Sequence, residues 1–289
     1  PSVSLCICTM NRPDELNEAL LSLKTSLAQP LEVIVSDDSR EDLAERVRGV
    51  TQAHPGVIYL RGPRKGLSAN RNACLKIVRG ELVSFIDDDQ KLHPEFLLRG
   101  PEEYIRLREL HGTERIIVTG NQTLPEGPLD PSNLNFLGFF TGQLPREGQP
   151  NAICIGAALI PAGLFRQAQF DENIFFGSEE SDISFHAAFL GYRIIYVGSL
   201  TNYHYPSSVN RDLYEGKVLQ SRLYFGLKRY WIYKRSLPRF LLFNLYAFVN
   251  AVGHCVKQLR FRESIAAVSA FLKAWKQFRG KLLELRSRT

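Results

Sequence analysis

Short apolar runs rich in Val, Ile and Leu alternate with segments of helical periodicity through the first half of the chain. The runs that we expect to form strands are residues 3–8, 31–36, 57–60 and 82–86. Parallel neighbouring strands must be joined by a long crossover, usually a helix, and helical segments separate these runs. The alternation therefore predicts an α/β fold with a Rossmann-like, mostly parallel central sheet that helices cover on both faces.

The helical segments are defined by the spacing of their leucines and by their end signals. Leu16, Leu20, Leu23 and Leu27 recur at helical spacing, and Asp14 after Pro13 is a plausible start. Further helices are predicted at residues 43–53, at 68–78, from about residue 94 and at 180–190. Further strands are predicted at residues 152–160 and 192–197.

Two parts of the chain depart from the alternating pattern. Residues 121–150 are rich in Pro, Gly and Asn with little periodicity, which predicts a long irregular excursion of the kind that often surrounds a binding site. After residue 204 the chain is expected to be almost wholly helical. The predicted fold is thus an α/β domain with a C-terminal helical extension.

The cysteines indicate the redox environment. There are five, an odd number, and none form a CxxC pair, so neither a disulfide framework nor a zinc cluster is indicated. Cys6 and Cys8 lie two apart on one expected strand and are predicted to be neighbours in the core. This pattern favours a location in the reducing cytoplasm.

Three consecutive carboxylates, Asp87, Asp88 and Asp89, follow the fourth apolar run. Ligands of open α/β sheets bind beyond the carboxyl ends of strands. Adjacent negative charges repel one another, which is easiest to understand if a divalent cation and a polyphosphate bind there. Hard oxygen ligands suit Mg²⁺ or Mn²⁺. An isolated triplet of this kind is also typical of a solvated acidic turn.

The acidic triplet is one of four segments that occur in a familiar order. They are VSLCICTMNR at residues 3–12, VIVSDDS at 33–39, GLSANRN at 66–72 and FIDDD at 85–89. Together they resemble the nucleotide-sugar half of the family 2 glycosyltransferases, over roughly residues 1–215. The resemblance implies a GT-A fold and inverting, metal-dependent sugar transfer from a nucleoside diphosphate. It also implies a catalytic domain at 1–215, with a nucleotide-sugar half at 1–120 and an acceptor half at 121–215, before a basic helical region at 216–289.

The resemblance assigns the donor pocket to the first two strand ends. It implies that Thr9, Asn11 and Arg12 border the nucleobase, and that Asp37 or Asp38 accepts a hydrogen bond from the base ring. Asp38 is the better positional match. The alternatives are a surface charge for Arg12 and a helix cap for the acids.

Arg71 matches the arginine that family members direct at the base or diphosphate, a task suited to a planar guanidinium. Lys65 is expected to assist it, and Asp87 and Asp88 are assigned to the donor site. For the metal, the resemblance implies Asp89 and Asp87 with His204. His204 taken alone would be an ordinary, partly buried histidine.

The catalytic base is expected at the segment GSEESD, residues 177–182, which resembles the Gly-x-Glu-Asp-x-Asp segment of the family. Glu180 occupies the position of the base, Glu179 is a substitute, and Asp182 is the last acid of the segment. Glu180 stands where the family usually has Asp, and His186 where Arg is common. The alternative is helix N-terminal charge. The QxxRW sequence of processive relatives is absent from residues 205–235, which favours a single transfer.

The C-terminal region is strongly basic. The chain carries a net charge of +6, yet residues 228–289 hold 14 Lys and Arg against 2 Asp and Glu. Residues 240–249 form an apolar stretch, too short to span a bilayer, that predicts a buried or interfacial helix. Phe261, Ile265, Val268, Leu272 and Trp275 mark one face of a basic amphipathic helix, which predicts binding of residues 237–289 to anionic lipid at the inner face of the membrane. The alternative is packing on the catalytic domain or on another subunit.

These features define the expected partners and the competing functions. UDP is the expected nucleotide, and the acceptor is expected to be a glycan or a lipid-linked saccharide. Nucleic-acid binding is not expected, because the tail carries no recognition motif, and homo-oligomerisation stays open. A sugar nucleotidyltransferase would show a glycine-rich loop after the first strand, whereas residues 9–13 contain no glycine. A non-catalytic binding module is the alternative from another class.

Overall fold

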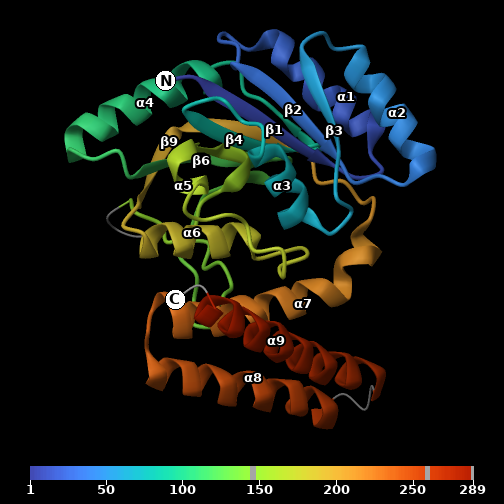
Figure 1. Ribbon diagram of the computed structural model, residues 1–289, viewed down its shortest axis with the longest axis vertical. Coiled ribbons are helices and arrows are strands. Elements are labelled where there is room, and N and C mark those ends of the chain that lie inside the picture. The colour runs from blue at the N-terminus through green and yellow to red at the C-terminus, as the bar shows by residue number, and fades with distance from the viewer. Residues whose placement is uncertain (144–147, 258–260, 288–289) are drawn as a thin grey trace.

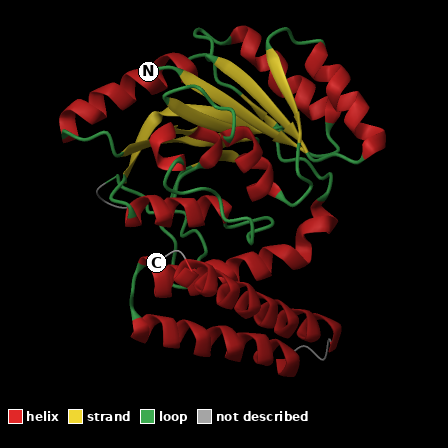
Figure 2. Cartoon of the chain, in the orientation of Figure 1, coloured by secondary structure: helices red, strands yellow, loops and turns green. Residues whose placement is uncertain are grey.

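The computed structural model describes residues 1–143, 148–257 and 261–287. A mixed sheet with helices on both faces forms one part of the molecule, and a layer of long helices from the C-terminal part of the chain lies beneath it (Figure 1). Figure 2 shows that the strands are confined to the first of these parts. The predicted α/β class with a C-terminal helical extension is confirmed.

The central sheet has a parallel half and a mixed half. Its order is β3 (Val57–Arg61), β2 (Glu32–Asp37), β1 (Val3–Thr9), β4 (Leu82–Asp87), β8 (Ala158–Pro161), β6 (Ile116–Leu124), β9 (Arg193–His204) and β5 (Gln90–Lys91), with β7 (Gly127–Leu129) paired to β6. The first four strands are parallel, as predicted, and β6 pairs in parallel with β9. The pairs that β8, β5 and β7 make are antiparallel.

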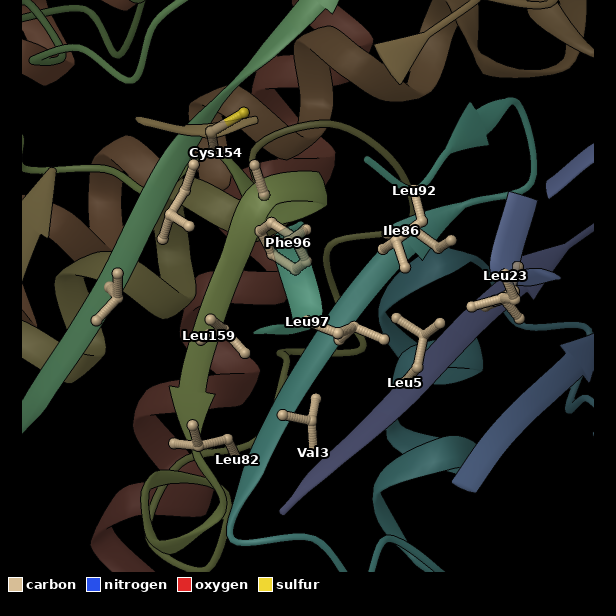
Figure 3. Close-up of a cluster of buried hydrophobic side chains, with 14 of the residues drawn as sticks. Val3, Leu5, Leu23, Leu82, Ile86, Leu92, Phe96, Leu97, Cys154 and Leu159 are labelled. Carbon is tan, nitrogen blue, oxygen red and sulfur yellow. The ribbon is translucent and has the colours of Figure 1, made fainter. Parts of the chain in front are cut away.

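Each face of the sheet has its own hydrophobic core. Val3, Leu5 and Ile7 of β1 contribute to the core that packs α1 (Pro13–Ser22), α2 (Glu41–Gln52) and α4 (Phe96–His111), part of which Figure 3 shows. Cys6 and Cys8 point to the opposite face, which packs α3 (Leu67–Leu75), α5 (Ala162–Phe165) and α6 (Glu179–Phe189). Alternating side chains of a strand point to opposite faces. The predicted placement of these two cysteines in the core is confirmed.

The differences from the sequence-based prediction lie in the second half of the sheet. Residues 155–157 form a 3₁₀ turn before β8, so only the end of the predicted strand at 152–160 is extended. A Cβ at Gly156 would collide with the side-chain ends of Gln90 and Gln122, so glycine allows these two side chains to approach the turn. The predicted strand at 192–197 instead continues as β9 to His204. The predicted excursion at 121–150 begins as the β6–β7 hairpin, and residues 144–147 of it lie outside the described residues.

The described residues beyond 204 are mostly helical, as predicted. It forms α7 (Arg211–Lys228), a π-helical turn (Arg229–Tyr233), α8 (Leu237–Lys257) and α9 (Phe261–Ser287). A third core joins these helices to α6 through side chains that include Phe185, Tyr224, Phe243 and Phe278. The predicted boundary between residues 215 and 216 falls within α7. The division into a catalytic domain and a helical region stays a prediction.

The apolar face predicted for α9 is not buried as a whole, because Leu272 is 62% exposed and Val268 and Trp275 are half-buried. Ala274 and Phe278 are fully buried, and Trp275 packs on Phe240 of α8. The side chains of Phe261 and Ile265, which the prediction placed on this face, lie outside the described ones. The side of α9 that packs on protein is therefore the one with Ala274 and Phe278, next to the predicted face, which stays partly exposed at Leu272. Within the described residues, no helix combines the length and the apolarity that crossing a membrane requires.

Candidate active site

The carboxyl ends of the parallel strands meet at one edge of the sheet and open into a cavity of about 640 Å³. The strand register places Thr9 of β1 opposite Asp37 of β2, and Cys8 opposite Asp87 of β4. The predicted site residues that line the cavity are Thr9, Arg12, Asp38, Asp87, Asp88, Asp89 and His204. Because the carboxyl ends of parallel strands lie at a common edge, residues that are far apart in sequence converge here.

The three acids at the end of β4 each have a different set of partners. Asp87 accepts a hydrogen bond from Arg71 Nη2 at 3.2 Å. Asp88 accepts from the Thr9 hydroxyl at 2.7 Å and from Arg12 Nη1 at 2.9 Å. Asp89 contacts Arg12 Nη1 at 3.2 Å and His204 Nε2 at 3.4 Å. The repulsion expected within the triplet is therefore offset by partners on separate elements.

The charge states of Asp88 and Asp89 differ because their partners differ. Burial, with the neighbouring carboxylates, raises the pKa of Asp88 to about 7 despite Arg12 and the Thr9 hydroxyl. Burial acts on Asp89 as well, but hydrogen bonds from His204 and from the Ser207 backbone N–H lower its pKa overall. Burial disfavours the His204 cation, yet the contact with Asp89 raises its pKa. Asp89 is thus the acid of this pair that stays ionised at neutral pH.

Of the three predicted metal ligands, Asp89 and His204 contact each other, with His204 Nε2 3.4 Å from an Asp89 oxygen. The second ring nitrogen of His204, Nδ1, lies 3.2 Å from Gln122 Oε1, which orients Nε2 toward Asp89. The described residues contain no group of three or more His, Cys, Asp and Glu side chains arranged to hold a metal. Mg²⁺ and related ions commonly use one or two carboxylates, with water and substrate phosphates as the remaining ligands. Asp87, also predicted as a ligand, is paired with Arg71.

Of the second acidic pair, Asp37 and Asp38, one residue is buried and the other lines the cavity. Asp37 is fully buried and accepts hydrogen bonds from the Tyr59 hydroxyl at 2.9 Å and the Ser39 backbone at 2.8 Å. Asp38 lines the cavity and accepts from the Arg64 backbone N–H, while burial raises its pKa. No side chain caps α2. Asp38 is therefore the acid of this pair that is available to a bound molecule.

Besides Asp37, three further residues predicted for the donor pocket lie outside the cavity lining. Asn11 adopts a positive φ of 61°, and its side chain contacts Asn210 and the Arg40 backbone. Lys65 is exposed on the loop before α3. Arg71 is buried and connects Asp87 to Glu179, whose Oε1 lies 3.2 Å from its Nη1. Burial disfavours the Arg71 cation, but these two carboxylates raise its pKa and keep it charged.

An aromatic wall of the cavity was not predicted. The rings of Phe176 and Tyr214 stack with centroids 3.9 Å apart at 11°, and Phe175 also lines the cavity. Gly66 adopts a φ of 100°, and a Cβ there would collide with Phe175, so glycine allows this close approach. The two phenylalanines directly precede the acidic segment at 177–182, which was a usable signal. Tyr214 on α7 has no local motif.

The acids at the start of α6 point in different directions. Glu179 is buried against Arg71, and its Oε2 has no hydrogen-bond partner. Glu180 is half-buried and accepts from the Ile155 backbone N–H at 3.3 Å, while burial and the charge of Glu179 raise its pKa to about 7. Glu180 does not line the cavity. Arg71 contacts both Glu179 and Asp87, and so links α6, the helix that carries Glu180, to the acidic edge of the sheet.

Asp182 is turned toward the C-terminal helices. Its carboxylate accepts from Lys228 Nζ at 2.7 Å and from the Tyr233 hydroxyl at 2.9 Å. Lys228 is itself buried and also donates to Asp171 at 2.6 Å. The chain does not bring Asp182, predicted among the catalytic residues, into the cavity. It anchors α6 to α7 and to the π-helical turn.

The sheet order, the acidic edge and the cavity define an α/β protein of the GT-A type. Residues 4–157, more than half of the chain, match the family described as Glycosyl transferase family 2, and the chain belongs to that family. The predicted family membership and fold are confirmed.

Relatives and solved structures agree with this assignment. The chain is 33% identical over 95 residues to GalNAc(5)-diNAcBac-PP-undecaprenol beta-1,3-glucosyltransferase of Campylobacter jejuni, covering 32% of this chain and 31% of that protein. The chain spans about a third of the length of the curated relatives it matches.

Two solved structures share the fold at low identity. TarS 1–349 of S. aureus, in complex with UDP-GlcNAc, has a TM-score of 0.60 at 17% identity, covering 95% of this chain and 81% of that chain. The mannosyltransferase PcManGT of Pyrobaculum calidifontis, in complex with GDP-Man and Mn²⁺, has a TM-score of 0.58 at 14% identity, covering 96% and 87%.

The buried cation Lys228 generates a stability prediction. Replacing it in Lys228→Met leaves Asp171 and Asp182 buried without their common partner, which should lower the free energy of unfolding by about 3–5 kcal/mol. Urea titration measures the loss. The matched control Lys276→Met changes an exposed lysine of α9 and should shift stability by no more than about 0.5 kcal/mol. Equal losses in the two variants would show that the buried network does not hold the helices together.

Proposed function

We propose that the chain transfers a single sugar, with inversion, from a nucleoside-diphosphate sugar to an acceptor hydroxyl, using Mn²⁺ or Mg²⁺. The observation that carries the proposal is one cavity lined both by an aromatic wall beside Asp38 and by the pair Asp89 and His204. A flat aromatic surface suits a nucleobase, whereas an ionised acid beside a histidine suits a cation that holds a diphosphate. The family assignment supports the same reaction.

The donor half of the proposal rests on groups that match the parts of a nucleotide. Phe176 and Tyr214 offer a stacking surface, and Asp38 offers an acceptor to a base ring nitrogen. Solved relatives of the fold hold UDP-GlcNAc and GDP-Man, so both nucleotides occur on it. UDP is the nucleotide that we propose for this chain. Arg12 and Thr9 border the same cavity and hold Asp88 in position.

Asp89 and His204 would hold the cation. A bound Mn²⁺ or Mg²⁺ supplies charge that stabilises the departing diphosphate. PcManGT and GalNAc-T7 are described with Mn²⁺, which supports the choice of a divalent ion. The remaining positive charge near the leaving group comes from Arg12, whose guanidinium already contacts Asp88 and Asp89.

Glu180 is proposed as the base. The acceptor oxygen bonds to the anomeric carbon as the bond from that carbon to the diphosphate oxygen breaks, and a Glu180 oxygen takes the hydroxyl proton. A pKa of about 7 is well matched to this task, since the ideal base titrates near the working pH. Glu179 is the weaker candidate because its Oε1 is already engaged by the buried Arg71. Asp182 is proposed to act only by holding α6.

The acceptor and the cellular location complete the proposal. A glycan or a lipid-linked saccharide, in polysaccharide or glycolipid synthesis, suits a chain whose residues 228–289 carry 14 basic residues against 2 acidic ones. The Campylobacter jejuni relative is named for an undecaprenol-linked substrate, which supports a lipid-linked acceptor. We propose a cytoplasmic enzyme at the inner face of a membrane, with residues 1–215 catalytic and the basic helices at 216–289 facing the lipid.

Diphosphate release tests the proposal directly. With Mn²⁺, a sugar nucleotide and an acceptor, Glu180→Gln should release nucleoside diphosphate about 10²–10⁴-fold more slowly than the wild type, because the amide cannot accept the proton. Donor affinity, followed by thermal shift, should be unchanged. Glu179→Gln is the matched control and should retain more activity. Absence of release by the wild type with UDP-, GDP- and dTDP-sugars would end the proposal.

The raised pKa of Glu180 predicts the direction of the pH profile. Only the ionised carboxylate accepts a proton, so kcat/KM should rise as the pH increases through about 7 and level off above it. Steady-state rates across neutral pH measure this limb. A flat profile would contradict the assignment. A limb that persists unchanged in Glu180→Gln would assign the titration to another group, such as Asp88.

The aromatic wall predicts a loss of donor affinity on truncation. Tyr214→Ala removes the ring that stacks on Phe176, and a lost base–aromatic stack costs about 1–3 kcal/mol of binding free energy. Calorimetric titration with UDP and Mn²⁺ measures the change. The control Phe189→Ala removes an exposed ring at the far end of α6 and should leave the affinity as it was. Equal affinities in the two variants would show that the nucleobase does not stack on this wall.

A further inference from the structure

Helix α8 is apolar on both of its sides. Phe240, Phe243 and Ala247 face inward and are buried against α7, α9 and the π-helical turn. The opposite side, which we call the outer face of α8, is 45–61% exposed and consists of Leu241, Leu242, Leu245, Tyr246, Phe248 and Val249. Figure 1 shows α8 at the edge of the helical layer that lies farthest from the sheet. One side of this helix is therefore part of the core, and the other is largely exposed, although the Phe248 ring contacts Phe271 of α9.

The spacing makes the outer face continuous. Leu237, Leu241, Leu245 and Phe248 recur at intervals of four, four and three residues, which places them on one stripe of the helix. Leu242 and Val249 widen the stripe. A contiguous apolar surface of this kind on a folded protein marks a site of contact with another apolar surface. Scattered exposed leucines elsewhere, such as Leu110 on α4, form no such stripe.

The charges around the outer face indicate what that partner is. Lys234, Arg235 and Arg239 are exposed at the start of α8. On α9, the exposed residues include Lys273, Lys276, Arg279 and Arg286, together with Leu272 and Leu283. Only two acids occur in residues 228–289. An apolar face among basic residues matches a surface that is apolar inside and negatively charged at its rim, as an anionic bilayer is.

A second copy of the chain fits these charges less well. Symmetric pairing of two outer faces would bring the basic residues of both copies together, with few acids to neutralise them. A bilayer with anionic headgroups supplies the missing negative charge. α8 lies along the protein surface with one side buried, which suits a helix seated in the plane of the headgroups.

We infer that the outer face of α8 docks the chain on an anionic lipid surface, with basic residues of α9 and of the start of α8 on the headgroups. On α9 the exposed Leu272 and Leu283 stand among basic residues, whereas the outer face of α8 is apolar, so α8 is the element that inserts into the lipid. This specifies the membrane contact of the proposed function, but docking needs neither donor nor turnover, so it can be tested separately.

Vesicle binding of the full chain tests the docking. The triple variant Leu241→Gln, Leu242→Gln and Leu245→Gln makes the outer face polar without touching the buried side. Its partition onto vesicles of phosphatidylcholine and phosphatidylglycerol in equal amounts should fall by at least about tenfold relative to the wild type, since each leucine loses apolar transfer free energy. The matched control changes exposed leucines elsewhere to Gln, at Leu27, Leu98 and Leu110, and should bind like the wild type.

Two further measurements distinguish an anionic lipid surface from a second copy of the chain as the partner. Lys276→Ala with Arg279→Ala should lower binding to the anionic vesicles and should have little effect with phosphatidylcholine alone. The leucine variant should keep the melting temperature of the wild type and its thermal shift with UDP and Mn²⁺. Wild-type binding that the leucine variant retains would overturn the inference. So would a wild type that ignores vesicles but forms a dimer which the leucine variant dissociates, as light scattering would show.

Discussion

Three adjacent carboxylates at the end of β4 impose the central constraint on this structure, because each must be compensated separately at a crowded strand end. Arg71 compensates Asp87 from α3, Arg12 reaches Asp88 from the loop after β1, and Asp89 contacts His204 at the end of β9. β9, α3 and the loop before α1 each supply one of these partners. The cavity exists where these partners converge.

The same electrostatic logic connects the acidic edge to the rest of the molecule. Arg71 lies between Asp87 and Glu179, so the sheet and α6 share one buried cation. On the other side of α6, Lys228 joins Asp182 to Asp171. The helix that carries Glu180 is thereby held between two buried cations, one from each part of the chain. The C-terminal helices are in this sense a structural support of the candidate site.

Much of the fold and part of the site could be predicted from residue patterns. The four parallel strands were located within a few residues, and Asp87 to Asp89 were expected at the cavity because parallel strands end at a common edge. Asp38, preferred to Asp37 as the acid for the base ring, lines the cavity, whereas Asp37 is buried. The stacking of Tyr214 on Phe176 and the burial of Arg71 against Glu179 were not predicted, because they join positions that no local motif relates.

The sequence by itself determined which residues are apolar, acidic or basic and at what spacing, and hence the strands, the helices and the acidic strand end. Only the tertiary structure decided which partner each of these surfaces has. In α9 the sequence predicted an apolar face that includes Leu272, yet packing buried Ala274 and Phe278 and left Leu272 and the outer face of α8 exposed. Periodicity is a property of one helix, whereas burial depends on how several helices share a limited core.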